Sequence, residues 1–225
     1  MECPVSDQPD DAPGGSGSPP PEADATARAK ARWRRALLAA RARAPREVRE
    51  AADAALLGEL SGLVRRSRAS VVAAYAPMGS EPGGPHLPAA LAATGVRLLL
   101  PVLRDDLDLD WAAYQGAGSL RPTRRGMREP VSPRLGVAAV AGADLVVVPA
   151  LAVDAAGVRL GRGGGSYDRA LARVPASTLV VALLYDGELV DRLPAEPHDR
   201  RVGAVIMPGS GVVVLPTSAG RVAAG

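Results

Sequence analysis

Short apolar runs that alternate with helical segments constrain the fold of this 225-residue chain more than any other feature of its sequence. Four segments have the composition or apolar spacing of helices, over residues 26–43, 46–66, 86–94 and 167–173. Six runs have the length of strands, over residues 71–75, 96–100, 107–114, 144–149, 179–185 and 202–207. Short apolar strands that alternate with helices are typical of a parallel sheet covered on both faces. We therefore predict an α/β fold, a three-layer sandwich around a mostly parallel central sheet.

Two of the predicted strands have distinctive features. Pro101 is expected to close the strand over 96–100, since proline has no amide hydrogen for a neighbouring strand. The segment 107–114 alternates only weakly between apolar and polar residues, and we expect it to form a more exposed strand.

The first 25 residues differ from the rest of the chain in composition. They are rich in Pro, Gly and Ser and hold six acidic residues but no Lys or Arg. Such a segment buries too little apolar surface to offset the entropy lost on ordering. We predict a disordered tail over residues 1–25, which does not have the pattern of a secretory signal, and a single domain over residues 26–225.

The scarcity of certain residue types excludes several kinds of site. Cys3 is the sole cysteine, which excludes a disulfide framework and a cysteine-based zinc site. With His86 and His198 as the two histidines, neither a histidine-rich metal centre nor a Ser-His-Asp triad is expected. No apolar run reaches about 18 residues, the length of a transmembrane candidate. We expect a cytoplasmic protein that does not bind a membrane.

Positive charge is concentrated in one block of the sequence. Residues 26–68 hold twelve basic residues against four acidic ones, whereas residues 69–225 are nearly neutral. The block contains Lys30, the sole lysine in a chain with 26 arginines. Chance in an arginine-rich composition is one explanation. The other is a position where arginine would not serve, because lysine is a compact point charge and arginine a planar fork.

A glycine-rich loop between a buried strand and a short helix carries the strongest functional signal. It holds four glycines and two arginines, namely Gly161, Gly163, Gly164, Gly165, Arg159 and Arg162. Exposed backbone N–H groups, two cations and a helix start suit an anion such as a polyphosphate. The loop is neither a Walker A motif nor a Rossmann GxGxxG in its usual position. The alternative is a flexible surface loop with solvated arginines.

Asp168 lies three residues beyond the last glycine of the loop. A carboxylate beside bound phosphates suits Mg²⁺, which takes one or two carboxylates together with phosphate oxygens and waters. The alternative is an acidic residue that stabilises the start of a helix. Composition and spacing alone therefore indicate a soluble α/β domain that binds phosphate groups.

Five ordered motifs then connect the chain to a known family. They are Lys30-x-x-x-Arg34, Tyr75-x-Pro-x-x-x-Glu81, Gly126-x-x-Glu129-Pro130, the loop Arg159-Leu-Gly-Arg-Gly-Gly-Gly-Ser-Tyr-Asp168, and Leu193-Pro194-x-x-x-x-Asp199. In kind and order they resemble the motifs of the 5-formyltetrahydrofolate cyclo-ligases, also called 5,10-methenyltetrahydrofolate synthetases. The resemblance covers about residues 28–210.

That resemblance implies a fold and a reaction. The fold would be Rossmann-like, of the type shared with ribose-phosphate isomerases and CoA transferases. The reaction would be an ATP- and Mg²⁺-dependent closure of 5-formyltetrahydrofolate to 5,10-methenyltetrahydrofolate, with release of ADP and phosphate. The formyl oxygen would attack the γ-phosphate, and N10 would then displace phosphate from the activated carbon. Positioning and charge neutralisation would do most of the work.

The resemblance also implies roles for residues. ATP would be bound by Lys30, Arg34, Arg159, Leu160, Gly161, Arg162, Gly163, Gly164, Gly165, Ser166 and Tyr167. The folate would contact Tyr75, Met78, Glu81, Trp111, Arg162, Gly163, Gly164, Gly165 and Ser166. Arg162 and Tyr167 would be catalytic, and Asp168 and Asp199 would hold Mg²⁺. The basic N-terminal helix would fold back to complete the ATP site. We expect a monomer with a small-molecule substrate and no nucleic-acid partner.

One position departs from the family pattern. Ser166 stands where the family usually has the first of two tyrosines, so one aromatic stacking surface is missing. Several assignments also have structural alternatives: Lys30 and Arg34 as solvated helix charges, Glu81 and Asp199 as exposed turn residues, and Met78 and Trp111 as packing residues.

Two other function classes fit parts of the sequence. A non-catalytic relative that binds nucleotide or RNA would explain the basic block, although aromatics for base stacking are few. Another ATP-dependent kinase or ligase on the same fold would act on a different carboxylate-bearing molecule. Glu81 distinguishes this kinase or ligase function from the folate cyclo-ligase function. The amino and ring N–H groups of a pterin are donors suited to a carboxylate.

Overall fold

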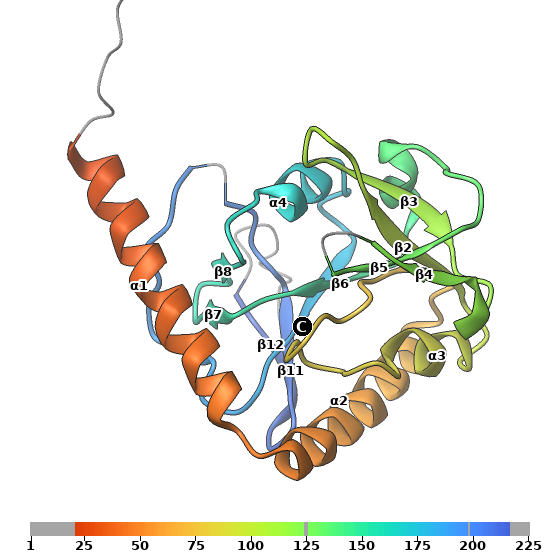
Figure 1. Ribbon diagram of the computed structural model, residues 1–225, viewed down its shortest axis with the longest axis horizontal. Coiled ribbons are helices and arrows are strands. Elements are labelled where there is room, and N and C mark those ends of the chain that lie inside the picture. Colours follow the sequence, from red (N-terminus) through yellow and green to blue (C-terminus); the bar gives the residue numbers. More distant parts are fainter. Residues whose placement is uncertain (1–20, 124–125, 198, 217–225) are drawn as a thin grey trace, which may run out of the picture.

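The computed structural model describes residues 21–123, 126–197 and 199–216. A sheet of seven strands forms its centre, and Figure 1 shows the elements arranged around it. The strand order is β12-β11-β9-β6-β1-β2-β3. Their bounds are β1 Val71–Ala73, β2 Arg97–Leu103, β3 Leu109–Ala113, β6 Leu145–Pro149, β9 Leu179–Leu183, β11 Ala204–Met207 and β12 Gly211–Val214. The five inner strands are parallel, and the edge strands β3 and β12 pair antiparallel. The predicted mostly parallel sheet is confirmed.

Helices cover both faces of the sheet because the inner strands are apolar on both sides. Within β6, Val146 and Val148 pack into one core cluster while Leu145 and Val147 pack into the other. The helices α2 (Arg46–Ser67) and α3 (Leu87–Ala92) bury their leucines in the second cluster. The helix α4 (Ser166–Leu171) and the 3-10 turn η2 (Val137–Gly142) cover the opposite face. This arrangement is the expected three-layer sandwich.

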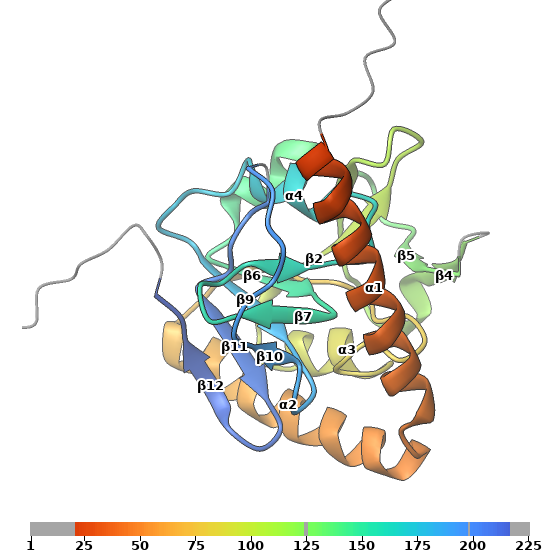
Figure 2. The same ribbon diagram turned by 90° about the vertical axis from the view of Figure 1, so that its left-hand side faces the viewer.

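The long helix α1 (Pro21–Arg43) lies along one side of the molecule, apart from the α2 and α3 layer (Figure 1), and it is in front when that side faces the viewer (Figure 2). Trp33 and Leu37 pack against a small third cluster made of Ala152, Val158, Leu160 and Leu193. The helix begins five residues before the predicted boundary at residue 26. Proline suits the first helical position, and Asp24 forms an ion pair with Arg28 one turn later. The remainder of the predicted tail, residues 1–20, lies outside the described residues.

Two small sheets complete the fold, and the sequence patterns did not predict them. One consists of β10 (Leu189–Val190), β7 (Ala152–Asp154) and β8 (Arg159–Leu160), and it carries the start of the glycine loop. The other is the hairpin of β4 (Leu120–Pro122) and β5 (Arg128–Pro130), preceded by the 3-10 turn η1 (Ala117–Ser119). Strands of two or three residues are too short to produce a recognisable alternation.

Two strand predictions differ from the structure. Strand β2 does not end at Pro101, as predicted, but continues to Leu103. Beyond Leu99 it pairs with β3 alone, so a proline there removes no hydrogen bond to β1. Strand β3 is buried rather than exposed, since η2 and α4 cover it: Leu109, Trp111 and Ala112 are 3 %, 0 % and 0 % exposed. Among the described residues, no helix is both long and apolar enough to span a membrane.

Candidate active site

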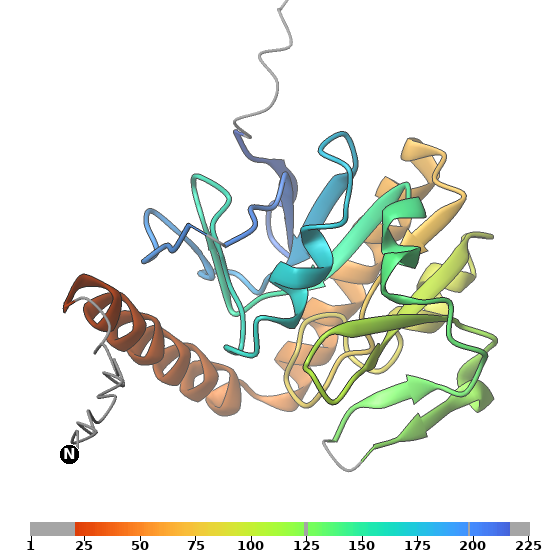
Figure 3. The same ribbon diagram turned by 90° about the horizontal axis from the view of Figure 1, so that it is seen from above.

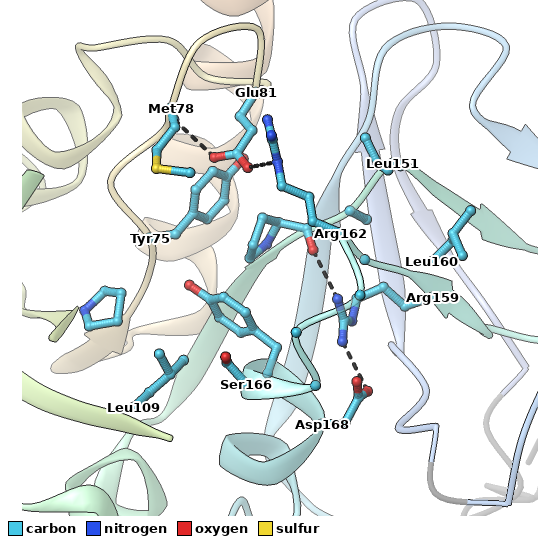
Figure 4. A pocket seen from close by; sticks show the side chains of 18 of the residues that line it. Tyr75, Met78, Glu81, Leu109, Leu151, Arg159, Leu160, Arg162, Ser166 and Asp168 are labelled. Carbon is cyan, nitrogen blue, oxygen red and sulfur yellow. Dashed lines mark hydrogen bonds and ion pairs between the residues drawn. The ribbon is translucent and has the colours of Figure 1, made fainter. Parts of the chain in front are cut away.

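A cavity of about 320 Å³ opens at the carboxyl ends of the parallel strands, near β1 and β6 (Figure 4). The chain passes from β1 to β2 on one side and returns to β6 on the other, so the strand order reverses there. Open α/β sheets bind ligands at such switch points, and the volume suits a small molecule. The walls come from α1, the segment after β1, the glycine loop, the β4–β5 hairpin and the segment around Asp199.

Lys30 lies at the α1 end of the cavity and is 6 % exposed. Its ammonium Nζ donates to Glu196 Oε2 at 2.6 Å and to Asp199 Oδ2 at 2.7 Å. The residues come from opposite ends of the chain, so α1 is tied to the segment that follows β10. The family motifs single out Lys30 and Asp199, whereas Glu196 stands inside the motif that ends at Asp199, at a position that the family pattern leaves open.

Arg34, one turn after Lys30, fixes α1 against the glycine loop. Its Nε donates to the carbonyl oxygen of Gly161 at 2.9 Å. Gly163 has a φ of 105°, and a Cβ atom there would lie 3.3 Å from the Arg34 guanidinium carbon. A side chain at residue 163 would therefore be strained in the backbone and crowded by Arg34. The expected return of the basic helix to this loop is present.

Arg159 and Asp168 form the base of the loop. Arg159 is 6 % exposed, and it donates from Nη2 to Asp168 Oδ1 at 2.9 Å and from Nη1 to the Pro149 carbonyl at 3.2 Å. Asp168 Oδ1 also accepts from the backbone N–H of Arg200 at 3.3 Å. Asp168 is thereby held close to the segment that carries Asp199.

Glu81 and Arg162 meet across the cavity (Figure 4). Arg162 Nε donates to Glu81 Oε1 at 2.9 Å, and the backbone N–H of Met78 donates to Glu81 Oε2 at 2.9 Å. The Glu81 side chain is 9 % exposed and the Arg162 side chain 44 %. The carboxylate is therefore buried and held by its own turn, whereas the guanidinium that pairs with it is partly exposed.

Two tyrosines line the space between these charged groups. Tyr75 donates its hydroxyl to the Pro82 carbonyl at 2.6 Å, and the Tyr167 ring lies 5.8 Å from the Arg159 guanidinium carbon. Burial, with the negative charge of Glu81 as a second cause, raises the pKa of both hydroxyls. Both therefore remain protonated at neutral pH and can donate hydrogen bonds.

The structure brings nearly all of the predicted site residues to this one cavity. The exception is Trp111 of β3, which is fully buried in a core cluster and is not among the lining residues. Its geometry supports the packing alternative. Ser166 does line the cavity, at the first position of α4.

Sequence reasoning missed Arg41, which also lines the cavity and is 3 % exposed. It forms a two-pronged ion pair with Glu188, from Nε and Nη2, with both distances 2.7 Å. Arg41 shares one helical face with Lys30 and Arg34, and this spacing was the one available signal.

The acidic groups are sparse for a metal centre made of protein alone. Among the described residues, no group of three or more His, Cys, Asp or Glu side chains could hold a metal ion. Asp168 and Asp199 nevertheless fit Mg²⁺ that is bound chiefly by phosphates, because this ion commonly takes one or two carboxylates and completes its shell with phosphate oxygens and water.

Comparisons with known proteins give the same result as the motifs. Residues 26–208 match the model of the 5-formyltetrahydrofolate cyclo-ligase family. A 5-formyltetrahydrofolate cyclo-ligase of Mycolicibacterium smegmatis is 46% identical over 187 residues, 81% of this chain and 95% of the relative. One of Escherichia coli K12 is 34% identical over 117 residues, 51% of this chain and 64% of the relative.

Solved structures agree in fold. The NMR structure of an Aquifex aeolicus 5,10-methenyltetrahydrofolate synthetase matches with a TM-score of 0.71 and 26% identity, and the match covers 87% of this chain and 96% of the other. A Mycoplasma pneumoniae synthetase matches in fold with a TM-score of 0.62 at 17% identity. Together with the motifs around the cavity, these matches show that the chain belongs to the 5-formyltetrahydrofolate cyclo-ligase family.

Proposed function

We propose that this protein closes 5-formyltetrahydrofolate to 5,10-methenyltetrahydrofolate at the expense of ATP, acting as a monomer in the cytoplasm. The observation that carries the proposal is the convergence of five separate family motifs on one cavity. Along this cavity, a cationic glycine-rich end is followed by a wall with a fixed carboxylate, Glu81. A triphosphate and a pterin need these two environments.

The α1 end would bind the triphosphate. Lys30 and Arg34 supply positive charge there, and the backbone of Gly163 and Gly164 can approach a phosphate closely. Lys30 is paired with Asp199, and Arg159 with Asp168. When bound with the nucleotide, Mg²⁺ would neutralise charge on the phosphates and the two aspartates. Lys30 and Arg159, which line this end of the cavity, would donate hydrogen bonds to phosphate oxygens.

The opposite wall would bind the pterin. Glu81 accepts donors at both oxygens, and it would exchange the partly exposed Arg162 for the pterin amino and ring N–H groups. Tyr75 and Met78 would contact the ring faces. Arg162, released from Glu81, would point between the two substrates, where the formyl oxygen and the γ-phosphate meet.

The chemistry needs charge stabilisation more than a protein base. The formyl oxygen attacks the γ-phosphorus, the bond to the β-phosphate oxygen breaks, and ADP leaves. N10 then attacks the formyl carbon, loses its proton, and the carbon–oxygen bond breaks to release phosphate. Arg162 would stabilise the charge on the transferred phosphoryl group. The protonated Tyr167 would donate a hydrogen bond at the same place.

The test follows the product spectroscopically. Purified protein is mixed with 5-formyltetrahydrofolate, Mg²⁺ and ATP, and the near-ultraviolet absorbance of the methenyl product is recorded against an ATP-free control. We expect an ATP-dependent rise whose rate falls by about 100-fold or more in Arg162→Ala, since the cation proposed to stabilise the transferred phosphoryl group is removed. Binding of ATP without any product in the wild-type protein would contradict the proposal.

The aspartates require their own variants. Asp168→Asn and Asp199→Asn keep the side-chain volume and remove the negative charge, so each should raise the Mg²⁺ concentration that gives half-maximal rate. Asp144→Asn, an exposed aspartate that caps the backbone amides of Ser70 and Val71, serves as the control. An unchanged Mg²⁺ dependence in both Asp168→Asn and Asp199→Asn would show that these aspartates do not bind the metal.

A further inference from the structure

The cavity extends beyond the wall proposed for the pterin and reaches the β4–β5 hairpin. Its lining there consists of Pro101, Leu103, Leu109, Met127, Arg128 and Glu129, and the Glu129 carboxylate accepts from the backbone N–H of Leu103. Helix α1 and the hairpin lie on opposite sides of the molecule in two views (Figures 1 and 3). The hairpin end is therefore remote from the end proposed for the triphosphate, and the chemical steps do not use it.

Arg128 differs from the other cations of the cavity. Each of the others donates to a carboxylate or a carbonyl within the protein, namely Lys30, Arg34, Arg41, Arg159 and Arg162. Arg128 is exposed, and within the described parts of the chain its guanidinium has neither a hydrogen-bond acceptor nor an ion-pair partner. Its five N–H groups are available to a ligand.

Strand pairing and a hydrogen bond hold the backbone that carries Arg128, whereas no partner among the described residues holds its guanidinium. Strands β4 and β5 pair antiparallel, with Arg121 opposite Glu129. The Glu129 carboxylate accepts from the backbone N–H of Leu103 at 3.0 Å, which holds β5 against the end of β2. The hairpin thus presents the Arg128 guanidinium, unpaired within the described ranges, beside the apolar side chains of this part of the cavity.

We propose that Arg128 binds the carboxylates of the glutamate tail of the folate and sets the preference for substrates with anionic tails. The inference rests on the proposed function. With the pterin at Glu81, the next part of the molecule is an aminobenzoyl ring, which suits the apolar side chains of Pro101, Leu103 and Met127. The last part is a glutamate with two carboxylates, which a guanidinium binds with its planar fork. Arg128 is a specificity residue and takes no part in bond making.

The experiment compares two substrates in Arg128→Ala and wild-type protein. One is 5-formyltetrahydrofolate, and the other is the same compound with both tail carboxylates converted to amides. For the acid, we expect Arg128→Ala to raise KM about fivefold while kcat and the KM for ATP stay unchanged, since an exposed charge pair is being removed. For the diamide, the variant and the wild type should have the same KM, because the partner of Arg128 is already absent.

Controls separate this effect from damage to the hairpin. Arg121→Ala removes an exposed arginine of the same hairpin that does not line the cavity and should leave both KM values unchanged. The advantage of wild type over Arg128→Ala should shrink as salt is raised. An equal rise in KM for acid and diamide, or no rise for either, would overturn the proposal.

Failure of the proposed function would look different. If wild-type protein forms no methenyl product, the reaction is wrong, and calorimetric binding of the acid and the diamide to the same variants still decides the role of Arg128. A weaker affinity of Arg128→Ala for the acid alone would support the proposal, and equal affinities would overturn it.

Discussion

Lys30 and Arg41 lie on the same face of α1, eleven residues and about 16 Å apart, and both are buried cations with acidic partners far away in the sequence. Their environments differ. The Arg41 fork is matched by both oxygens of Glu188 and by the Ala150 carbonyl. The Lys30 ammonium is a point charge between two carboxylates, at the end proposed for phosphates. One cation is fixed by its partners, and the other can exchange them.

This difference explains why the two positions hold different residues. The planar guanidinium of arginine is well suited to a permanent ion pair, because its two parallel N–H groups hold a carboxylate in one geometry. The ammonium of lysine has no such preferred plane, so it can exchange a carboxylate for a phosphate oxygen more easily. We infer that Arg41 fixes α1 to the fold and that Lys30 acts on the ligand. Four substitutions can break or sharpen this distinction.

Arg41→Met should have the largest effect, and it should be on stability. Removing one member of a buried ion pair leaves Glu188 uncompensated, at about 3–5 kcal/mol of unfolding free energy. For a chain of this size, the melting temperature should fall by about 10 °C. Thermal unfolding measures this, with kcat of the folded enzyme as the second readout. The double variant Arg41→Met with Glu188→Gln should recover part of the loss, and a further loss would contradict the pairing argument.

Lys30→Arg should reduce activity much more than stability, the opposite of Arg41→Met. The charge is kept, so the melting temperature should change by only a few degrees. A guanidinium would hold Glu196 and Asp199 in a fixed fork and release them poorly to the ligand. We expect kcat/KM for ATP to fall about 100-fold, which is about 2.7 kcal/mol of transition-state stabilisation. Near wild-type kcat/KM would show that charge alone matters at residue 30 and would remove the distinction from Arg41.

The two residues also show what could be predicted from the sequence. The central sheet, its helical layers and the glycine loop were predicted, because apolar runs and local motifs are written in contiguous residues. The glutamate partners of Lys30 and Arg41 were not. Glu196 and Glu188 are more than 140 positions away in sequence from these cations, and only the folded sheet brings them to α1. The predicted contact of Trp111 with the folate was wrong for a related reason. An aromatic side chain suits both a ligand site and a core, and Trp111 lies in the core because η2 and α4 cover β3.

Tyr185→Phe should have a smaller effect in the Arg41 region. The ring lies 5.5 Å from the Arg41 guanidinium carbon, and its hydroxyl donates to Asp53 Oδ1 at 2.9 Å. Phenylalanine keeps the ring and removes the hydrogen bond, so the unfolding free energy should fall by about 1 kcal/mol. Denaturant titration checks this value. A loss as large as that of Arg41→Met would mean that the hydroxyl, rather than the ion pair, holds α1 in place.

Asp53→Asn should have the smallest effect and should change how stability depends on pH. Burial raises the pKa of Asp53, although Oδ1 accepts from the Gly83 N–H at 2.8 Å and from Tyr185. Since the folded pKa is raised, the wild type is relatively most stable below pH 3.8 and loses stability as pH rises through the folded value. Asparagine keeps Oδ1 as the acceptor of both bonds and does not ionise. The wild type should therefore lose up to about 1 kcal/mol relative to the variant as pH rises, because the carboxylate is only partly buried.

Denaturant titrations of both proteins from pH 3 to pH 7 measure that difference. Because Gly83 belongs to the turn that carries Glu81, the same variant also reports on the site. If Asp53 only supports the turn, the KM for the folate should be unchanged in Asp53→Asn at neutral pH, since both hydrogen bonds survive. A raised KM together with an unchanged stability profile would place Asp53 of α2 with Lys30 among the ligand-responsive charges, and these charges would then no longer be confined to one end of α1.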